Sequence, residues 1–501
     1  MYLELQFNPT KLDCLQTLKR QVLSQELTQE FRIPDGLPDI GRVLGCWSEI
    51  VLRGKDWRSG NAGASGGAKV WALYEPENGE DLCCVESWIP FQMKWEIPDT
   101  RHDGAILVHP FLRGADARSL SARKLLLRVD MGMLSETVIP SEIEVYNAGE
   151  TPEDVQLLRK TYPMMIPKET GERSFAIEEE LRIPASNPQP KKLIHYALRP
   201  ELIDRKVMAD KVVFRGVALG HVLYLAEDNQ IHSWEFELPF SQYSQLDKDY
   251  DESANVRVIP VVTELELNCG ENGCLNLKAN ITGQYVVNEI VSVVMVEDAY
   301  SPVRSMELNR QQLQLPVILS SVQETVHTEL TVPIAANAVA DTTFYFDYPQ
   351  LNRKDDASEA ELTGNVQLLY YDENRILQNS TAEWNTTWKL MADSETDVEI
   401  GLYVSGMPQT SLNSEAVNVS GDLLLEAIVK CQYGMEMVTA LKLGEQLPPD
   451  PNRPSLVLRR AGDAGLWKLA KETGSTVERI LQANGLTQEP DREKMLLIPV
   501  Q

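Results

Sequence analysis

Alternation of apolar and polar positions runs through most of the chain and predicts β-strands. Residues 255–268 (NVRVIPVVTELELN), 275–287 (LNLKANITGQYVV) and 422–434 (DLLLEAIVKCQYG) carry this period of two and are rich in Val, Leu, Ile and Tyr. Turn-forming segments such as ENGE, EDNQ, GENG and DENR separate the strands. Amphipathic helical stretches are few, and the best one in the body is TPEDVQLLRKTY at 151–162. The pattern therefore predicts a mainly β fold.

A strand-ending motif occurs three times and indicates internal repetition. EFRIPDGLPDI at 30–40 returns as ELRIPASNPQP at 180–190 and, in weaker form, as ELTVP at 329–333. The glutamates that open the three copies are 150 and 149 residues apart. In each copy a proline follows the strand end, where it cannot continue the ladder of hydrogen bonds. A period this long indicates tandem domains rather than a solenoid.

A second landmark keeps the same phase. WALYEPENG, VLYLAEDNQ and LLYYDENRI align on Tyr74, Tyr224 and Tyr370. WIPF at 88–91 and ELPF at 237–240 follow, and the Trp-containing strand AEWNTTWKL takes that place in the third copy. These landmarks predict three tandem antiparallel β-sandwich or barrel-like domains, with bounds at 1–150, 151–305 and 306–445. Because they recur with the fold, we expect their aromatic residues to pack in the cores; these residues are Tyr74, Trp88, Tyr224, Trp234, Tyr370 and Trp384.

The chain changes character after the third copy. Residues 446–454 lie within the proline-rich stretch GEQLPPDPNRPS, which predicts a stiff, extended linker. The remainder, 455–501, reads as strand, helix, helix, strand, with SLVLRR and MLLIP as the strands. This end of the chain therefore predicts a small α+β (βααβ) domain projected away from the β body.

Capping residues and apolar faces mark the two helices of this unit. Gly462-Asp463 turns the chain, and the Asp463 carboxylate can accept from the first helical N–H groups. Gly474 ends the first helix, Thr476 caps the second, and Asn484-Gly485 stops it. The expected buried faces are Leu466, Leu469 and Ala470 on the first helix and Val477, Ile480 and Leu481 on the second.

The unit resembles a LysM domain, whose pattern runs strand, Gly-Asp-Thr, Leu-Trp, two helices, Asn-Gly and a final strand ending in Ile-Pro. The matching residues are Gly462, Asp463, Leu466, Trp467, Asn484, Gly485, Leu486, Ile498 and Pro499. LysM domains usually bind N-acetylglucosamine glycans in a shallow groove. By position, the resemblance implies a ligand- or partner-binding groove formed by Gly462, Asp463, Ala464, Gly465, Leu466, Asn484, Gly485, Leu486 and Thr487.

Two departures from the pattern change what this groove is expected to bind. Ala464-Gly465 replaces the usual Thr, and REKMLLIP lacks the usual Gly before the last strand. Because glycan recognition depends on placed hydrogen bonds, these changes favour a LysM scaffold used for protein contact. The alternative is a protein that binds peptidoglycan or N-acetylglucosamine through this unit.

The three repeats resemble the SPOCS domain of bacterial spore coat proteins of the SpoVID/SipL type. The marks are the E-hydrophobic-R-I-P strand end, the G…L-Y strand and the I-P-F strand, strong in the first two copies. Tandem copies followed by a LysM domain are the layout of clostridial coat morphogenetic proteins of the SipL type. The resemblance implies a scaffold made in the mother-cell cytoplasm, placed at the forespore surface, with a SpoIVA-like basement-layer ATPase and other coat proteins as partners.

Net charge and hydropathy restrict the partners and the location that we expect for the protein. The net charge is −27, of which 455–501 contribute +1 (7 Lys+Arg, 6 Asp+Glu), so the other 454 residues carry −28. Such acidity argues against nucleic acid and favours basic or metal-bridged partners. The first residues contain no apolar signal-peptide core, and the chain contains no apolar run long enough to span a membrane, so we expect neither a secreted nor a membrane protein.

The residue patterns offer little support for a catalytic or metal-binding site. GASGG at 63–67 fits the nucleophile-elbow pattern around Ser65, but Gly60 aligned with Gly216 and Gly364 makes the segment an insertion, hence a flexible loop. The six His form no metal-binding pair. We therefore expect a non-enzymatic protein with no catalytic residue, metal or cofactor. Cys269 and Cys274 flank a hairpin tip and could cross-link if oxidised, although a reducing compartment favours free thiols.

Overall fold

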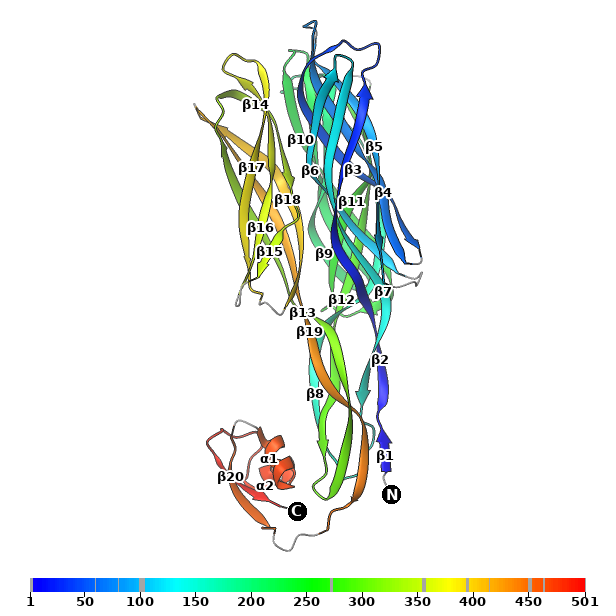
Figure 1. The fold of residues 1–501 in the computed structure, drawn as a ribbon, viewed down its shortest axis with the longest axis vertical. Helices are drawn as coiled ribbons and strands as arrows, with labels where there is room; N and C mark the ends of the chain where they lie inside the picture. The colour runs from blue at the N-terminus through cyan, green and yellow to red at the C-terminus, as the bar shows by residue number, and fades with distance from the viewer. Residues whose placement is uncertain are drawn as a thin grey trace.

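The computed structural model describes residues 3–500 except 59, 80, 99–103, 271–273, 354–356, 393–395, 414, 449–452 and 463–464. Antiparallel strands dominate these residues, so the predicted mainly β class is confirmed. The molecule is elongated, with paired sheets in its upper part, a narrow stem of long strands below, and the C-terminal unit beside the stem (Figure 1).

The first repeat forms two three-stranded antiparallel sheets. One has the order β2-β7-β6 and the other β3-β4-β5. The bounds are β2 Asn8–Arg32, β3 Ile40–Arg58, β4 Asn61–Pro76, β5 Cys83–Glu96, β6 Ala105–Ser121 and β7 Lys124–Asn147. The facing sides of the sheets enclose apolar residues such as Val70, Leu125 and Met131, all fully buried.

The second repeat has the same plan with one continuous strand in place of two. One sheet has the order β11-β12-β8, and the other pairs β10 with β9. The bounds are β8 Gln156–Arg182, β9 Pro190–Ala226, β10 Ile231–Tyr250, β11 Asn255–Cys269 and β12 Cys274–Tyr300.

The third repeat again combines two sheets. β19 lies between β13 and β18, while β16 pairs with β14, β15 and β17. The bounds are β13 Arg304–Val332, β14 Ala336–Phe346, β15 Gln350–Arg353, β16 Ser358–Asp372, β17 Leu377–Leu390, β18 Asp397–Leu412 and β19 Val417–Gln446. The N-terminal strand β1 (Leu3–Gln6) pairs with β19, so the start of the chain is tied to the third repeat.

The stem is built from β1 and from the extended ends of six longer strands, two from each repeat. The pairs β2–β7, β8–β12 and β13–β19 continue beyond the sheets, as Asn8↔Asn147 and Gln156↔Tyr300 illustrate (Figure 1). Their inward side chains pack as one cluster that contains Cys14 and Val145, Met164 and Met295, and Met435 and Met437. The repeats therefore share a core in the stem instead of forming independent beads.

The segment predicted as the best helix of the body is a strand. Residues 156–162 belong to β8 and pair with β12, with Leu157 opposite Ala299. Burial against the other stem strands outweighs the local helical periodicity of TPEDVQLLRKTY, because an amphipathic period is only a weak preference.

The glycine-rich segment predicted as an inserted loop is also a strand. Residues 61–67 form the first half of β4, with Gly66 opposite Phe91. In the same relation Gly216 lies opposite Phe240 and Gly364 opposite Trp384. The glycine equivalent to Gly216 is thus Gly66 and not Gly60, so the spacing to the landmark tyrosine is eight residues in both repeats and no insertion exists.

These three glycines are required by close backbone approach. A Cβ on Gly66 would lie 2.2 Å from the Val51 carbonyl oxygen, and one on Gly216 would lie 2.1 Å from that of Glu201. The corresponding distance at Gly364, to Tyr345, is 2.0 Å. An aromatic ring on the neighbouring strand covers each site, so glycine here serves packing rather than flexibility or catalysis.

The landmark tyrosines occupy the predicted core positions in the first two repeats. Tyr74 and Tyr224 are fully buried, and their hydroxyls donate to the Pro38 and Pro188 carbonyls at 3.1 and 3.0 Å. Trp384 is buried as well. The expectation is wrong for Trp88, which is 39% exposed beside Arg53. Trp234 and Tyr370 are half-buried.

One hydrogen-bonded cluster takes a residue from each repeat. The Asp341 carboxylate in β14 accepts from Trp47 Nε1 in β3 at 2.8 Å and contacts His221 Nε2 in β9 at 2.9 Å. Burial opposes ionisation of both groups, but their mutual contact raises the pKa of His221 and lowers that of Asp341. This buried cluster ties the three repeats together in the interior.

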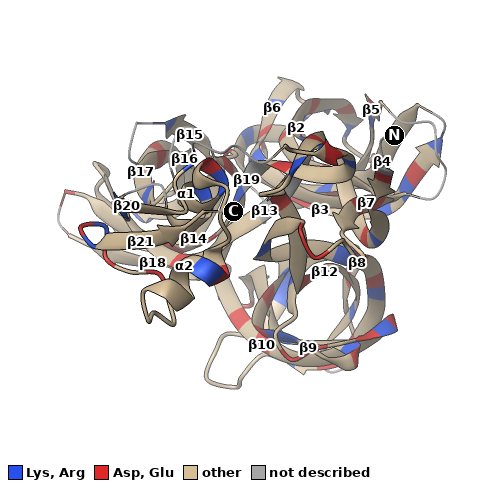
Figure 2. Ribbon diagram, turned by 90° about the horizontal axis from the view of Figure 1, so that it is seen from below, with Lys and Arg blue, Asp and Glu red and all other residues tan. Residues whose placement is uncertain are grey.

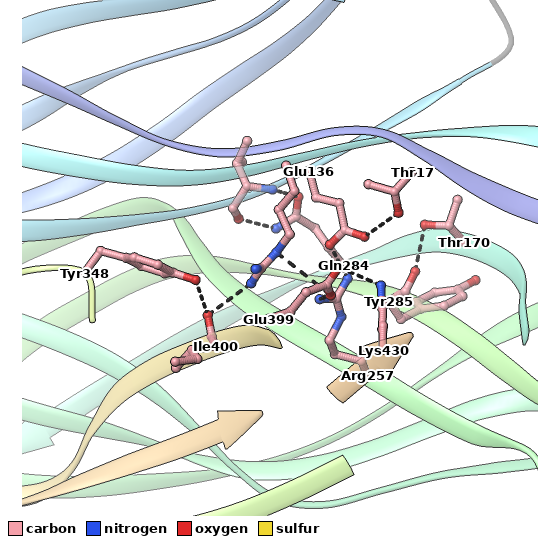
Figure 3. A network of polar contacts seen from close by, with 12 residues as sticks. Thr17, Glu136, Thr170, Arg257, Gln284, Tyr285, Tyr348, Glu399, Ile400 and Lys430 are labelled. Carbon is pink, nitrogen blue, oxygen red and sulfur yellow. Dashed lines mark hydrogen bonds and ion pairs between the residues drawn. The ribbon is translucent and has the colours of Figure 1, made fainter. Parts of the chain in front are cut away.

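A second buried network also joins the three repeats (Figure 3). Arg257 of β11 contacts Glu136 of β7 and lies 3.6 Å from Glu399 of β18, which pairs with Lys430 at 2.6 Å. Although burial opposes it, the surrounding cations, Arg257 first, lower the pKa of Glu136 to about 2. The contacts of Glu136 and Glu399 with cations of other strands therefore fix the relative positions of the repeats.

Candidate functional site

The C-terminal unit consists of β20 (Leu456–Arg460), α1 (Gly465–Thr473), α2 (Val477–Ala483) and β21 (Met495–Pro499), in the predicted order. Gly474 has a φ of +65° after α1, and the Thr476 side chain accepts from Arg479 N, as the capping pattern predicts. Leu466, Leu469 and Ala470 are buried beneath the helices, as predicted.

This unit is docked on the stem through α1. The Trp467 indole Nε1 donates to Asp298 at 2.9 Å, and Lys471 Nζ reaches the same carboxylate at 2.7 Å. Tyr300, two residues further along β12, packs edge-on against Trp467 with a centroid distance of 4.8 Å and donates to the Ser475 carbonyl at 3.0 Å. The expectation that the unit projects away from the body is therefore wrong, because specific contacts hold it on the stem. Residues 449–452 of the predicted linker lie outside the described residues.

The electrostatics of the docking contact favour an ionised Asp298. Burial opposes ionisation, but the hydrogen bonds from Lys471 and Trp467 outweigh it and lower the pKa of Asp298. Arg310 adds a third donor at 2.9 Å. A carboxylate surrounded by three donors anchors the unit as long as it stays charged.

A groove of about 870 Å³ lies between the unit and the stem. Three successive residues of β8, Gln156, Leu157 and Leu158, form one wall. Both helices and the segment after α2 form the other, through Leu466, Trp467, Val477, Glu478, Leu481, Gln482, Leu486 and Glu489. Seven of the eleven residues that line the groove are apolar, and its charged members are Glu478 and Glu489.

The first predicted site loop is only partly described. Asp463 and Ala464 lie outside the described residues, so the predicted Asp463 cap is not described. Gly462 has a φ of +66° and donates to the Arg492 carbonyl at 2.9 Å. Gly465 begins α1 with a φ of +72°, and Leu466 is buried with its backbone N–H bonded to Glu489 at 2.7 Å. The described residues of this loop are thus engaged in contacts within the unit.

The second predicted site loop is pinned by Asn484. Its amide donates to the Ile480 and Leu497 carbonyls, both at 2.7 Å, and its oxygen accepts from Leu497 N at 2.9 Å. Gly485 takes a φ of +60° and Thr487 is exposed, while Leu486 is half-buried in the groove. Seven of the nine predicted groove residues are described, and of these the structure places Leu466 and Leu486 on the groove wall.

Several residues that the sequence pattern did not single out hold the unit together and in place. Glu489 caps α1 from a loop more than twenty residues away. Asp298 and Tyr300 belong to β12 of the second repeat. Only Glu489 carried a local signal, as an acid in the loop that faces the Gly-Asp turn. The stem residues carried none, because their partners are 169 and 175 positions away.

The hairpin cysteines are free in the structure. Cys269 pairs in register with Leu275, and Gly270 N donates to the Cys274 carbonyl. The two side chains therefore lie on opposite faces of the ribbon, which does not favour the cross-link considered above.

Charges of both signs are interspersed along the strands seen from the stem end (Figure 2). No helix in the described ranges is long and apolar enough to cross a bilayer.

The fold defines a class of mainly β proteins in which a two-sheet repeat recurs and a small βααβ unit docks beside it. Comparison with protein families adds one finding. Residues 189–269, which span β9, β10 and β11 of the second repeat, match the family model described as SipL, SPOCS domain. This supports a SipL-like protein with a role related to sporulation. No curated protein and no solved structure matches the chain.

Proposed function

We propose that this chain is a non-enzymatic scaffold of the bacterial endospore coat, linking coat layers to the basement-layer ATPase on the forespore surface. The observation that carries the proposal is the SPOCS-domain match at 189–269, in a repeat whose strand plan recurs in the other two. The LysM-like unit is the docking module in this proposal, and the mother-cell cytoplasm is the compartment.

The architecture supports a load-bearing role rather than a flexible tether. The three repeats share a stem core and two buried polar clusters. A force applied to one repeat is therefore transmitted to the others. A single chain with several contact surfaces can gain avidity in an assembling shell.

The C-terminal unit supports a protein partner over a glycan. Sugar recognition needs free, placed donors and acceptors. The Asn484 amide and the Leu466 N–H are engaged within the unit, and seven of the eleven residues that line the neighbouring groove are apolar. Peptidoglycan binding through this unit remains the second candidate, favoured by the LysM-like order of strands and helices.

The test compares the full chain with a variant lacking 455–501. Each is measured against the immobilised basement-layer ATPase, against chitin oligomers and against insoluble peptidoglycan. We expect saturable binding of the full chain to the ATPase, at least tenfold weaker binding of the truncated variant, and no saturable binding to either glycan. Saturable glycan binding without ATPase binding would establish the second candidate instead.

A further inference from the structure

The outer face of the two-stranded sheet in the C-terminal unit is unusually apolar. β20 and β21 pair with Leu458 opposite Leu497 and Arg460 opposite Met495. Leu456, Leu458, Met495 and Leu497 share one face and are 51%, 61%, 49% and 41% exposed. The other face carries Leu496 and Ile498, which are fully buried beneath the helices. Four large apolar side chains gathered on an exposed face mark an interaction surface.

The two edges of this sheet differ in whether their backbone groups already have partners. On β21 the Asn484 side chain bonds both the N–H and the C=O of Leu497, so that edge is closed. It follows that Leu458 and Leu497 form a pair without mutual backbone hydrogen bonds. The flanking pairs that do bond are marked by Val500 N to the Ser455 carbonyl and Ala461 N to the Lys494 carbonyl.

The alternation of bonded pairs leaves the backbone of β20 open on its other side. The N–H and C=O groups of Leu456, Leu458 and Arg460 point away from β21. In the described part of the chain no strand other than β21 pairs with β20. An exposed edge above an apolar face is a template for strand addition.

Charge indicates which strand fits this edge. Arg459 and Arg460 end β20, and their carboxylate partners, Glu472 at 3.8 Å and Glu493 at 3.0 Å, are solvent-exposed. Exposed pairs of this kind contribute little and exchange readily. Arg459 lies on the opposite face of β20 from Leu456 and Leu458. An incoming strand with apolar side chains over the two leucines and carboxylates on the other face, beside Arg459, therefore complements the site.

We propose that β20 is the docking edge for an extended segment of a partner protein that alternates apolar and acidic residues. A second copy of this chain suits the edge less well, because the rest of each copy carries −28 and the copies repel. The inference deepens the proposed function and rests on it only for the identity of the partner.

The test uses the full chain and a labelled peptide of alternating Val and Glu, with a Val and Lys peptide as the charge control. We expect fluorescence anisotropy to show saturable binding of the Val-Glu peptide and at least tenfold weaker binding of the Val-Lys peptide. Amide hydrogen exchange at Leu456, Leu458 and Arg460 should slow at least tenfold in the presence of the Val-Glu peptide.

Two variants at one position separate the backbone from the side chain. Leu458→Pro removes an outward N–H that has no partner in the sheet, so it blocks strand addition with little loss to the pairing with β21. Leu458→Thr removes apolar surface but keeps that N–H. We expect Leu458→Pro to weaken peptide binding at least tenfold and Leu458→Thr to weaken it less.

Three outcomes would overturn the inference. They are unchanged exchange across β20, equal peptide affinity of Leu458→Pro and the unaltered chain, and a solution dimer that Leu458→Pro dissociates. A chain that binds the ATPase while β20 stays unprotected removes this docking edge but leaves the proposed function standing.

Discussion

The indole Nε1 of Trp467 donates a hydrogen bond of 2.9 Å to the carboxylate of Asp298, across 169 positions of sequence. The contact joins the first helix of the C-terminal unit to the end of the stem strand β12, two residues before that strand ends at Tyr300. It fixes the position of the unit relative to the body and creates the groove bounded by β8.

Replacing Asp298 should release the C-terminal unit. Asp298→Asn removes the charge that Lys471, Trp467 and Arg310 share, and we expect faster hydrogen exchange in α1 and faster proteolysis near the linker. Glu297→Gln is the matched control, since Glu297 pairs with Lys160 and not with the unit. Equal proteolysis of Asp298→Asn and the unaltered protein would show that the docking does not depend on this carboxylate.

The docking should also weaken in acid. The folded pKa of Asp298 lies below its ordinary value of 3.8, so its contribution is fully present above about 3.8 and is lost as the pH falls through the lowered pKa. Hydrogen exchange of α1, corrected for the intrinsic effect of pH, should report this loss. Asp298→Asn should abolish the pH dependence, and a dependence that persists in the variant would assign it to another group.

The Trp47–Asp341–His221 cluster should stabilise the packing of the repeats. Asp341→Asn leaves the buried His221 without its charged partner, and breaking a buried pair in this way costs about 3 kcal/mol. The raised pKa of His221 contributes stability below 6.5 that is lost as the pH rises through the folded pKa, whereas the lowered pKa of Asp341 contributes above 3.8. Urea unfolding should therefore show the largest difference from the unaltered protein between about pH 4 and 6.5, and a pH-independent difference would contradict this account.

The three glycines that face a backbone carbonyl, Gly66, Gly216 and Gly364, should tolerate no side chain. A Cβ on Gly66 would lie 2.2 Å from the Val51 carbonyl oxygen, so Gly66→Ala must displace backbone and we expect a loss of about 1–3 kcal/mol. Gly114→Ala is the control, because no atom lies within 4 Å of a Cβ there and its φ is not positive. Thermal unfolding of the two variants distinguishes a packing requirement from a general cost of replacing strand glycines.

Glu489 should act as the cap of α1. Its carboxylate accepts from Leu466 N at 2.7 Å at the positive end of the helix, so Glu489→Ala should destabilise the unit by about 1 kcal/mol. Glu489→Gln keeps an acceptor and should lose less. Hydrogen exchange confined to 465–483 measures this, and identical exchange in both variants would show that Glu489 does not cap the helix.

Local pattern was sufficient where neighbouring residues decide the structure. The strands end before Pro34, Pro184 and Pro333, and the helix caps at Gly474 and Thr476 stand where predicted. These features depend on backbone chemistry within a few residues, which a single sequence contains. The fold class followed from the same local signals.

Contacts between distant segments could not be predicted from local sequence pattern. TPEDVQLLRKTY has a helical period but becomes part of β8, because pairing with β12 and burial in the stem outweigh local preference. The glycines at 63–67 looked like a loop, yet the Val51 carbonyl oxygen and the Phe91 ring, both on other strands, leave no room for a side chain at Gly66. Asn484 looked like a groove residue but closes the β21 edge.

The sequence by itself determined that this protein is mainly β, that its strand plan repeats with a period near 150 residues, and that a βααβ unit follows. Each of these rests on short-range periodicity, turn chemistry or direct self-similarity. Only the tertiary structure decided that the repeats share a stem, that Trp467 and Tyr300 hold the unit against it, and that the free edge of β20 faces outward. The physical reason is that cross-strand partners and buried ion pairs are chosen by three-dimensional packing among residues far apart in the chain.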